Sequence, residues 1–325
     1  MKILVTGGAG YIGSVTTELL LDDGYNVTVF DNLGRGHRNA VDSRAKLIEG
    51  DLADRDRIRE VMLAEKPDAV MHFAAFALVG ESMQHPEMYF GNNVGGCINL
   101  AEAMLAADIG KVVLSSTCAT YGEPQKVPIT EDEPQYPTNP YGESKLMCER
   151  LLDWYHRLYG MRAVFLRYFN ACGATEKFGE DHDPETHLIP IVLEVALGRR
   201  EKVLVYGTDY PTPDGTCIRD YIHIADLARA HILAVETDVS GAFNLGNGNG
   251  FSVKQVIEAA RRITGCAIPT EDTERRPGDP PLLVADAGRA REALKWEPAL
   301  PDLDEIIGGA WKWHQAHPDG YGENG

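Results

Sequence analysis

The chain has 325 residues, of which 44% are hydrophobic and 25% are charged, and its formal net charge is -18. This composition is typical of a folded globular protein that can form one large domain or two modest ones. The acidic balance argues against nucleic acid and anionic membranes as partners, because both are polyanions.

The six cysteines form no CxxC pair and no metal-type spacing with histidine. We expect them to be reduced structural thiols, and we expect no bound metal. Met1 leads directly into an apolar stretch, and no apolar run of 18 residues follows. We therefore expect a cytoplasmic protein with no membrane partner.

A glycine-rich turn follows the first expected strand. Residues 2–6 form a short β-branched run, and Gly7, Gly10 and Gly13 come next, before a helical pattern over residues 14–23. Glycines at this spacing allow a tight turn and let backbone N–H groups approach a pyrophosphate at the helix N-terminus. In this strand-turn-helix context the glycines predict dinucleotide binding.

The second expected strand, residues 26–30, ends at Asp31 and Asn32. An acidic side chain about twenty residues after the glycine turn can accept hydrogen bonds from the ribose of an adenosine. Its negative charge disfavours a 2′-phosphate, so the sequence favours NAD over NADP. The nearby Arg35 and Arg38 keep NADP open as an alternative.

Strands and helices continue to alternate up to residue 169. Strands are expected at residues 46–49, 69–73, 111–114 and 163–169, and helices at 54–65, at 88–107 and from 141 onward. This order predicts a doubly wound parallel sheet of Rossmann type. Asn92 and the hydroxyls of Ser115, Ser116 and Thr117 would then lie near the crevice where such sheets bind ligands. A turn or a helix cap would explain the hydroxyls equally well.

Tyr141 and Lys145 are four residues apart in an expected helix and so share one face. A nearby ammonium favours the phenolate of a tyrosine, and lowering the usual pKa near 10 by about three units takes roughly 4 kcal/mol. A bound oxidised nicotinamide ring would be the natural second contributor. On its own, such a pair is most often solvated helix surface.

After Asn170 the sequence changes to glycine- and proline-rich loops between shorter elements, including residues 207–215 and 270–281. We expect residues 1–169 to form a dinucleotide-binding domain, which also receives segment 217–247. Residues 170–325 would form a smaller mixed α/β domain that binds the substrate. Arg219 and Arg276, with Asp279 nearby, would either clamp a phosphate or form surface ion pairs.

The glycine turn, Asp31, the hydroxyls at 115–117 and the Tyr-Lys pair, in this order, resemble the extended short-chain dehydrogenase/reductase superfamily. Further stretches resemble the UDP-glucose 4-epimerase family. They are VTGGAGYIGS at 5–14, HFAA at 72–75, LRYFN at 166–170, DYPTPDGT at 209–216 and IRDYIH at 218–223. The resemblance covers nearly the whole chain, through to WKWH at 311–314.

This resemblance implies reversible C4 epimerisation of UDP-galactose and UDP-glucose through a transient 4-keto sugar, with tightly bound NAD. Tyr141, Lys145 and Thr117 would be catalytic. The implied NAD contacts are Gly7, Gly10, Tyr11, Ile12, Gly13, Asp31, Asn32, Asp51, Leu52, Phe73, Ala74, Ala75, Asn92, Ser115, Lys145 and Tyr168. The implied substrate contacts are Thr117, Tyr141, Asn170, Leu188, Tyr206, Arg219, Arg276, Asp279 and Leu283. The family also implies a homodimer that pairs through two long helices.

Several positions depart from the family pattern. Ala77 stands where some members have Lys, His187 replaces an Asn before Leu188, and Thr117 replaces the commoner Ser. Leu283 stands where the family sets the size of the pocket beside the sugar 2-substituent. Its bulk favours UDP-glucose and UDP-galactose over UDP-N-acetylhexosamines.

Other functions fit parts of the same pattern. Epimerases of UDP-pentoses, UDP-uronates or UDP-N-acetylhexosamines would use the same C4 chemistry. A sugar 4,6-dehydratase is disfavoured, because Cys118 and Ala119 follow Thr117 where dehydratases have Asp-Glu. A non-catalytic NAD-binding regulator would usually lack part of the acid/base set that Thr117, Tyr141 and Lys145 complete.

Overall fold

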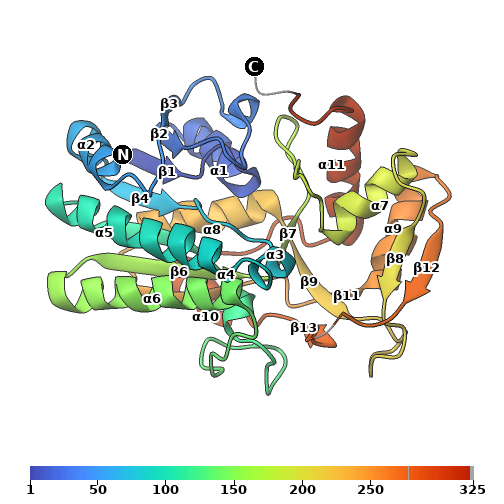
Figure 1. Cartoon of the computed structure of the whole chain (residues 1–325). Helices are drawn as coiled ribbons and strands as arrows, with labels where there is room; N and C mark the ends of the chain where they lie inside the picture. Colours follow the sequence, from blue (N-terminus) through green and yellow to red (C-terminus); the bar gives the residue numbers. More distant parts are fainter. Residues whose placement is uncertain (277, 323–325) are drawn as a thin grey trace.

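The computed structural model describes residues 1–276 and 278–322. Residue 277, in the loop 270–281, and residues 323–325, at the end of the second expected domain, lie outside the described residues. Two lobes lie side by side, with the first half of the chain in the larger one (Figure 1). Among the helices of the described part, none has the length and apolarity needed to span a membrane.

A parallel sheet of seven strands forms the centre of the larger lobe, in the order β10, β6, β5, β4, β1, β2, β3. The strands are β1 (Lys2–Thr6), β2 (Asn26–Asp31), β3 (Lys46–Glu49), β4 (Ala69–His72), β5 (Lys111–Thr117), β6 (Arg162–Tyr168) and β10 (Gly241–Leu245). The strand order reverses between β1 and β4, and such a switch point leaves a crevice at the carboxyl ends of the strands.

Helices cover both faces of this sheet. One face carries α2 (Arg55–Glu65), α5 (Gly96–Ala106) and α6 (Pro140–Tyr159); the other carries α1 (Tyr11–Asp22), α8 (Ile224–Glu236) and α10 (Gly288–Leu294). Successive strand residues point to opposite faces of the sheet. Leu4 therefore packs in the core under α2, α5 and α6, whereas Ile3 and Val5 pack in the core under α1, α8 and α10. The predicted doubly wound sheet of Rossmann type is confirmed.

The smaller lobe has its own sheets and its own apolar core. Strand β9 (Ile218–His223) pairs with β7 (Asn170–Cys172), β11 (Gly250–Ser252) and β13 (Leu282–Leu283). A separate parallel pair joins β8 (Val203–Tyr206) to β12 (Thr270–Thr273). Helices α7 (Leu188–Ala196), α9 (Val253–Thr264) and α11 (Leu303–Ala316) close the core, which contains Val192, Ile257 and Ile306.

Segment 217–247 contributes to both lobes. Its first part, β9, lies in the smaller sheet, whereas α8 packs on the larger sheet and β10 pairs in parallel with β6. The division of the chain at residue 169, with segment 217–247 assigned to the first domain, stays a prediction.

One long helix was predicted over residues 88–107, and the structure has an unbroken helical run there, in which a π-helical turn stands between two α-helical parts. Short helices α3 (Val79–Ser82) and α4 (Pro86–Tyr89) precede a π-helical turn, Phe90–Gly95, and only then does α5 begin. Within this turn the Asn93 side chain accepts a hydrogen bond from Phe76 N and donates one to Phe76 O, at 2.8 and 3.1 Å. Such π-helical turns are frequent at functional sites.

Strand β5 is longer than the predicted 111–114. It runs on to Thr117, so Ser115, Ser116 and Thr117 lie inside the strand instead of beyond it. The three residues pair with Leu166, Arg167 and Tyr168 of β6 and are buried. In the sequence, three successive hydroxyl side chains suggest a loop, because polar runs are rare in central strands. In the structure, buried polar side chains form hydrogen bonds with the hydroxyls of Ser115 and Ser116. A short 3-10 turn, Cys118–Thr120, follows the strand.

Candidate active site

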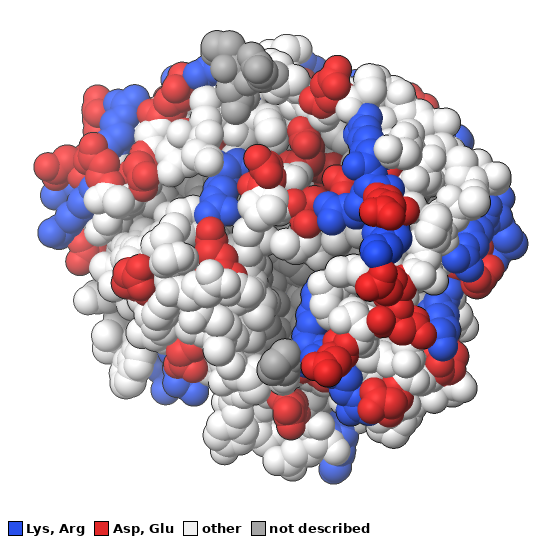
Figure 2. Space-filling model, turned by 45° about the vertical axis from the view of Figure 1, so that its right-hand side comes forward, with Lys and Arg blue, Asp and Glu red and all other residues white. Residues whose placement is uncertain are grey.

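The carboxyl ends of the central strands face the smaller lobe (Figure 1). In the space-filling view the surface is hollowed between the lobes, and Lys and Arg side chains lie at the margin of this hollow next to Asp and Glu side chains (Figure 2). Basic side chains at this groove are notable in a chain of net charge -18, because they can attract an anionic ligand.

The glycine turn between β1 and α1 is tightly packed on one side and open on the other. Gly7 has φ 75°, and a Cβ there would lie 2.4 Å from Ala74 N, while a Cβ on Gly13 would lie 2.2 Å from Gly7 O. A Cβ on Gly10 would meet nothing closer than Gly7 O at 3.5 Å. Gly10 caps α1 without a side-chain hydrogen bond. The first turn of α1 therefore offers backbone N–H groups to an anion, which fits a pyrophosphate.

Asp31, the last residue of β2, is fixed beside this turn. Its Oδ2 accepts a hydrogen bond from Ala9 N at 2.9 Å, and its Oδ1 accepts one from Leu33 N at 2.8 Å. Burial raises the pKa of Asp31, and these backbone donors oppose the rise. Next to it, Asn32 Nδ2 donates to Asp51 Oδ2 at 2.9 Å. Three of the residues predicted to contact NAD thus gather at the ends of β2 and β3.

The other predicted cofactor residues follow the same edge of the sheet. Phe73 N and Ala74 N both donate to Thr6 O, which brings the end of β4 against the end of β1. Asn92 lies in the π-helical turn. Leu52 follows β3, and Ala75 follows Ala74. Ser115 and Tyr168 lie near the ends of β5 and β6, and their hydroxyl groups are hydrogen-bonded to each other. Tyr11 reaches across to the smaller lobe, where its hydroxyl donates to Gly173 O at 2.6 Å.

The start of α6 brings Tyr141 to Thr117. Asn139 caps the helix by accepting a hydrogen bond from Gly142 N at 2.9 Å, and Pro140 occupies the first helical position, where its missing N–H costs nothing. A Cβ on Gly142 would lie only 2.5 Å from Ala119 O. The glycine after Tyr141 therefore lets α6 approach the turn after β5, and Thr117 comes close enough to the Tyr141 hydroxyl to lower its pKa.

The protein groups alone do not produce the phenolate that the Tyr-Lys spacing predicts. Burial raises the pKa of Tyr141 to about 12, and the hydrogen bond with Thr117 opposes the rise. Lys145 is buried and donates from Nζ to Ser115 O at 2.8 Å. Burial also lowers the pKa of Lys145. A base at Tyr141 thus needs further positive charge in the site.

Sequence reasoning missed a buried polar network behind these residues. Arg167 Nε donates to Glu149 Oε1 at 2.9 Å, Ser116 Oγ donates to the same oxygen at 2.5 Å, and Arg167 Nη1 donates to the Tyr121 hydroxyl at 2.9 Å. A signal was available, because Glu149 follows Lys145 by four residues and so shares its helix face. A charged residue on that apolar face indicates a buried partner.

Two further missed residues support the site from the π-helical turn and α4. Asn93 Nδ2 donates to Ser144 Oγ at 2.9 Å, which fastens the turn to α6. The ring of Tyr89 lies edge-on to that of Tyr141, with centroids 6.4 Å apart and planes at 78°. Tyr89 is fully buried, so it forms a rigid wall beside the candidate base.

Four of the predicted substrate residues gather in the smaller lobe. Arg219 forms an ion pair with Asp279 and donates from Nη1 to Ile218 O at 2.8 Å. The Arg276 guanidinium carbon lies 4.0 Å from the ring centroid of Tyr206. Arg276 and Asp279 also line a cavity of about 560 Å³. Asp279 thus links the two arginines, because it pairs with Arg219 and lines the same cavity as Arg276.

Leu283, Asn170 and Leu188 occupy separate positions around this region. Leu283 pairs with Arg219 and packs against the small cluster that contains Phe169, as does Cys118, the residue after Thr117. Asn170 begins β7, and Leu188 begins α7. The side chain of His187, just before Leu188, turns to Glu180 and Glu185.

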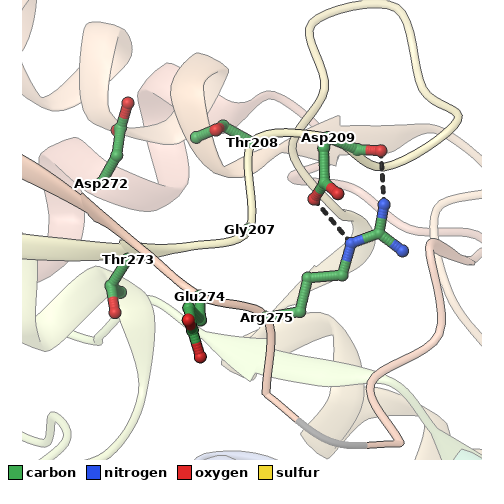
Figure 3. A pocket seen from close by; sticks show the side chains of 7 residues that line it. All are labelled: Gly207, Thr208, Asp209, Asp272, Thr273, Glu274 and Arg275. Atoms are coloured by element: carbon green, nitrogen blue, oxygen red, sulfur yellow. Dashed lines mark hydrogen bonds and ion pairs between the residues drawn. The ribbon is translucent and has the colours of Figure 1, made fainter.

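A second hollow, of about 540 Å³, lies at the ends of β8 and β12 (Figure 3). It is lined by Gly207, Thr208, Asp209, Asp272, Thr273, Glu274 and Arg275. Arg275 Nε donates to Asp209 Oδ1 at 2.7 Å, and this contact is drawn in Figure 3. The hollow contains none of the predicted site residues. Its three carboxylates outnumber its arginine, which does not suit an anionic substrate.

Known proteins resemble this chain over its full length. The model of the NAD dependent epimerase/dehydratase family matches residues 3–246. A UDP-glucose 4-epimerase of Lacticaseibacillus casei is 52% identical over 329 residues, covering 99% of each chain. A crystal structure of a UDP-glucose 4-epimerase superposes with a TM-score of 0.97 at 50% identity, covering 99% of this chain and 100% of that one.

A structure with ligands extends the comparison. The UDP-glucose 4-epimerase of Bifidobacterium longum, solved in complex with NAD+ and UDP, has a TM-score of 0.93 at 38% identity. The match covers 98% of this chain and 100% of that one. The similarity therefore spans both lobes and extends beyond the dinucleotide-binding half.

Proposed function

The chain belongs to the NAD dependent epimerase/dehydratase family, and we propose that it interconverts UDP-galactose and UDP-glucose by C4 epimerisation through a transient 4-keto sugar. The observation that carries this proposal is the meeting of Tyr141, Thr117 and Lys145 at the end of β5, on the edge of the sheet that holds the glycine turn. The full-length identity to UDP-glucose 4-epimerases supports the same reaction.

Residues along the carboxyl edge of the sheet would hold the cofactor. The open first turn of α1 suits the pyrophosphate, and Asp31 suits the adenosine ribose. When bound, NAD supplies the hydride acceptor and donor for C4, and its oxidised ring adds a positive charge that favours the phenolate. Because the reaction has no net redox change, the cofactor is expected to stay bound through turnover.

Tyr141 would move the proton. Its Oη takes the proton from the 4-hydroxyl of the sugar as C4 is oxidised and returns it when C4 is reduced again. The Thr117 hydroxyl lowers the pKa of Tyr141 by hydrogen bonding, against the rise caused by burial. Lys145 adds a fixed ammonium in the same interior, held by Ser115 O.

The smaller lobe would anchor the nucleotide while the sugar turns. The 4-keto sugar must present its opposite face before C4 is reduced, so the diphosphate has to stay in place while the sugar rotates. Arg219 and Arg276 can bind phosphate oxygens with their planar guanidinium groups. Asp279 orients Arg219, and the Tyr206 ring supports Arg276.

Leu283 would limit the sugar at its 2-substituent. It packs against the same small cluster as Cys118, which follows Thr117 at the strand end. A bulky side chain there leaves little room for an N-acetyl group, which favours UDP-glucose and UDP-galactose.

We also propose that the protein is a cytoplasmic homodimer. Large apolar side chains are exposed along the two long helices of one face, namely Ile98 and Leu105 on α5 and Met147, Trp154 and Leu158 on α6. An exposed apolar patch of this kind marks an interaction surface. Light scattering of the purified chain tests the dimer.

All six cysteines are unpaired, which is consistent with the reducing compartment proposed for the protein.

A panel of UDP-sugars tests the proposed substrate. Purified protein is incubated with UDP-galactose, UDP-N-acetylgalactosamine, a UDP-pentose and a UDP-uronate, and the products are separated by chromatography. We expect the highest kcat/KM with UDP-galactose. A higher kcat/KM with the pentose or the uronate would contradict the proposed substrate while keeping the C4 chemistry.

A further inference from the structure

The loop between β7 and α7 gathers side chains that the proposed reaction does not use. Glu180, His182, Glu185 and His187 each direct one ligand-type atom to a common point, and these atoms all lie within 4.8 Å of one another. The loop passes between α1 of the larger lobe and α11 of the smaller one (Figure 1).

The separations are close to those of a four-coordinate metal site. His187 Nδ1 lies 2.8 Å from Glu180 Oε1 and 3.0 Å from Glu185 Oε1. His182 Nδ1 lies 3.2 Å from Glu180 Oε1 and 3.8 Å from Glu185 Oε2. Ligands about 2.0–2.2 Å from a tetrahedral zinc ion are roughly 3.3–3.6 Å apart. Small side-chain rotations would therefore place an ion among the four groups.

Hydrogen bonding satisfies only part of the cluster. Glu185 Oε1 accepts hydrogen bonds from Thr186 N and His187 N, both at 2.7 Å, and lies 3.0 Å from His187 Nδ1. Each imidazole turns the same nitrogen, Nδ1, to both carboxylates, and that nitrogen carries at most one proton. His182 Nδ1 is buried and has no hydrogen-bond partner among the described residues. An unpaired buried polar atom is costly, and this one faces the carboxylates of Glu180 and Glu185, which points to a ligand among them.

Charge also favours a dication. The carboxylates of Glu180 and Glu185 are only 5% and 6% exposed, so their negative charges need a buried counter-charge. One dication with two neutral imidazoles would neutralise both carboxylates. Two nitrogens and two oxygens suit zinc and similar transition metals better than magnesium or calcium, which prefer oxygen ligands alone.

We propose that Glu180, His182, Glu185 and His187 bind a transition-metal dication, for which zinc best matches the donor set. With four protein ligands the site is closed, and such sites are structural. Here the ion would fix the loop that bridges the lobes. This role is independent of the proposed reaction.

Other contacts of the same loop show what the ion would stabilise. Trp313 Nε1 donates to Lys177 O at 3.2 Å, and Tyr321 N donates to Asp181 Oδ2 at 2.8 Å. On the other side, the Tyr11 ring packs edge-on to that of His182, with centroids 6.2 Å apart. Tyr11 is one of the predicted cofactor residues, so the ion would also support the wall of the cofactor site.

The competing explanation is an ion-paired cluster without metal. Burial lowers the pKa of His182, but contacts with Glu180 and Glu185 outweigh this effect and raise the pKa to about 9. A protonated imidazole could then neutralise a carboxylate directly. The two explanations differ in whether purified protein binds a metal ion.

Metal content and metal-dependent stability test the proposal. Untagged protein is purified without chelators, analysed by mass spectrometry for metals, stripped with dipicolinate, and titrated with Zn2+ or Mg2+ alone during thermal unfolding. We expect about one zinc ion per chain and a Tm that rises by several degrees with Zn2+ but not with Mg2+. Protein that takes up no zinc, or responds equally to Mg2+, would overturn the proposal.

Variants assign the ion to these residues. Glu185→Gln combined with His182→Ala should lose the zinc and the Tm response, whereas Asp183→Asn, an exposed carboxylate in the same loop, should keep both. Zinc retained by the double variant would show binding elsewhere and would contradict the proposal. If the double variant does not fold, His182→Ala alone is measured, and an unchanged zinc affinity in it would be equally contradictory.

Discussion

Lys145 donates a hydrogen bond from Nζ to the carbonyl oxygen of Ser115, over 2.8 Å. One helical turn earlier, the Tyr141 hydroxyl faces Thr117, two strand residues further on, and Thr117 lowers the pKa of Tyr141. Four residues of helix rise about 6 Å and two residues of strand rise about 6.6 Å. Helix α6 and strand β5 therefore match in length between these two contacts, and this match fixes the candidate base at the strand end.

Tyr141→Phe removes the proposed base and keeps the ring. We expect kcat to fall by about 10²–10⁴-fold, which is the usual contribution of a general acid-base group. The far-UV circular dichroism spectrum and the Tm should stay close to those of the parent protein. Turnover near the parent value would rule out Tyr141 as the base.

Thr117→Val removes the hydroxyl that lowers the pKa of Tyr141. The active base is the phenolate, so activity falls as the pH drops below the pKa of Tyr141. Loss of the hydroxyl raises that pKa, and the acid limb of the kcat/KM profile should move to higher pH. We expect a loss of about tenfold or more at neutral pH, because hydrogen bonds to charged groups contribute about 1.5–3 kcal/mol.

Thr117→Ser is the matched control for the pH profile. It keeps the hydroxyl and loses only a methyl group, so its acid limb should stay near that of the parent protein. A limb that shifts equally in the Ser and Val variants would mean that packing, and not the hydrogen bond, sets the pKa.

Leu283→Ala should widen the range of sugars. Removing the side chain makes room beside the 2-substituent, and a difference of even one methylene group in an apolar pocket is worth about 10–200-fold in specificity. We expect the kcat/KM ratio of UDP-N-acetylgalactosamine to UDP-galactose to rise by about tenfold or more. Leu204→Ala, at an exposed position on β8, should leave that ratio unchanged, and an unchanged ratio in Leu283→Ala would contradict the assignment.

Glu149→Gln should destabilise the fold. The Arg167–Glu149 pair is buried, with side chains 6% and 4% exposed, and Ser116 and Tyr121 complete its hydrogen bonds. Removing one partner of such a pair leaves an uncompensated charge and costs about 3–5 kcal/mol. Urea unfolding measures this free energy.

Asp153→Asn is the control on the same helix. Its ion pair with Arg157 is a surface pair, with side chains 41% and 61% exposed, and such pairs contribute about 0–1 kcal/mol. Equal losses in the free energy of unfolding for the two variants would show that the buried network contributes no more to stability than the surface ion pair.

The sequence predicts the larger lobe well because its signals are local. The β-branched run before Gly7, the acidic end of β2 and the alternation of strands with helices each follow from neighbouring residues. The length of β5 could not be predicted in the same way, because Ser115 and Ser116 are stabilised by Tyr168 and Glu149, which are 53 and 33 residues away. The π-helical turn likewise depends on the bonds of Asn93 to Phe76.

For the site, the sequence names candidate residues but does not reveal their contacts. The spacing of Tyr141 and Lys145 gives a shared helix face, but it does not show that Lys145 bonds to Ser115 O or that burial raises the pKa of Tyr141. His187 was seen only as a departure from the family pattern. Its partners Glu180 and Glu185 lie within seven residues of it, yet only the folded loop turns them to one point.

Incubating the purified protein with UDP-galactose, without added NAD, tests the central claim most directly. The sample is stopped by heat, and UDP-glucose is then measured with a coupled UDP-glucose dehydrogenase assay. We predict that UDP-glucose forms, which would establish both the C4 epimerisation and a retained cofactor. A repeat with added NAD distinguishes a lost cofactor from a wrong substrate. No UDP-glucose under either condition would contradict the proposed function.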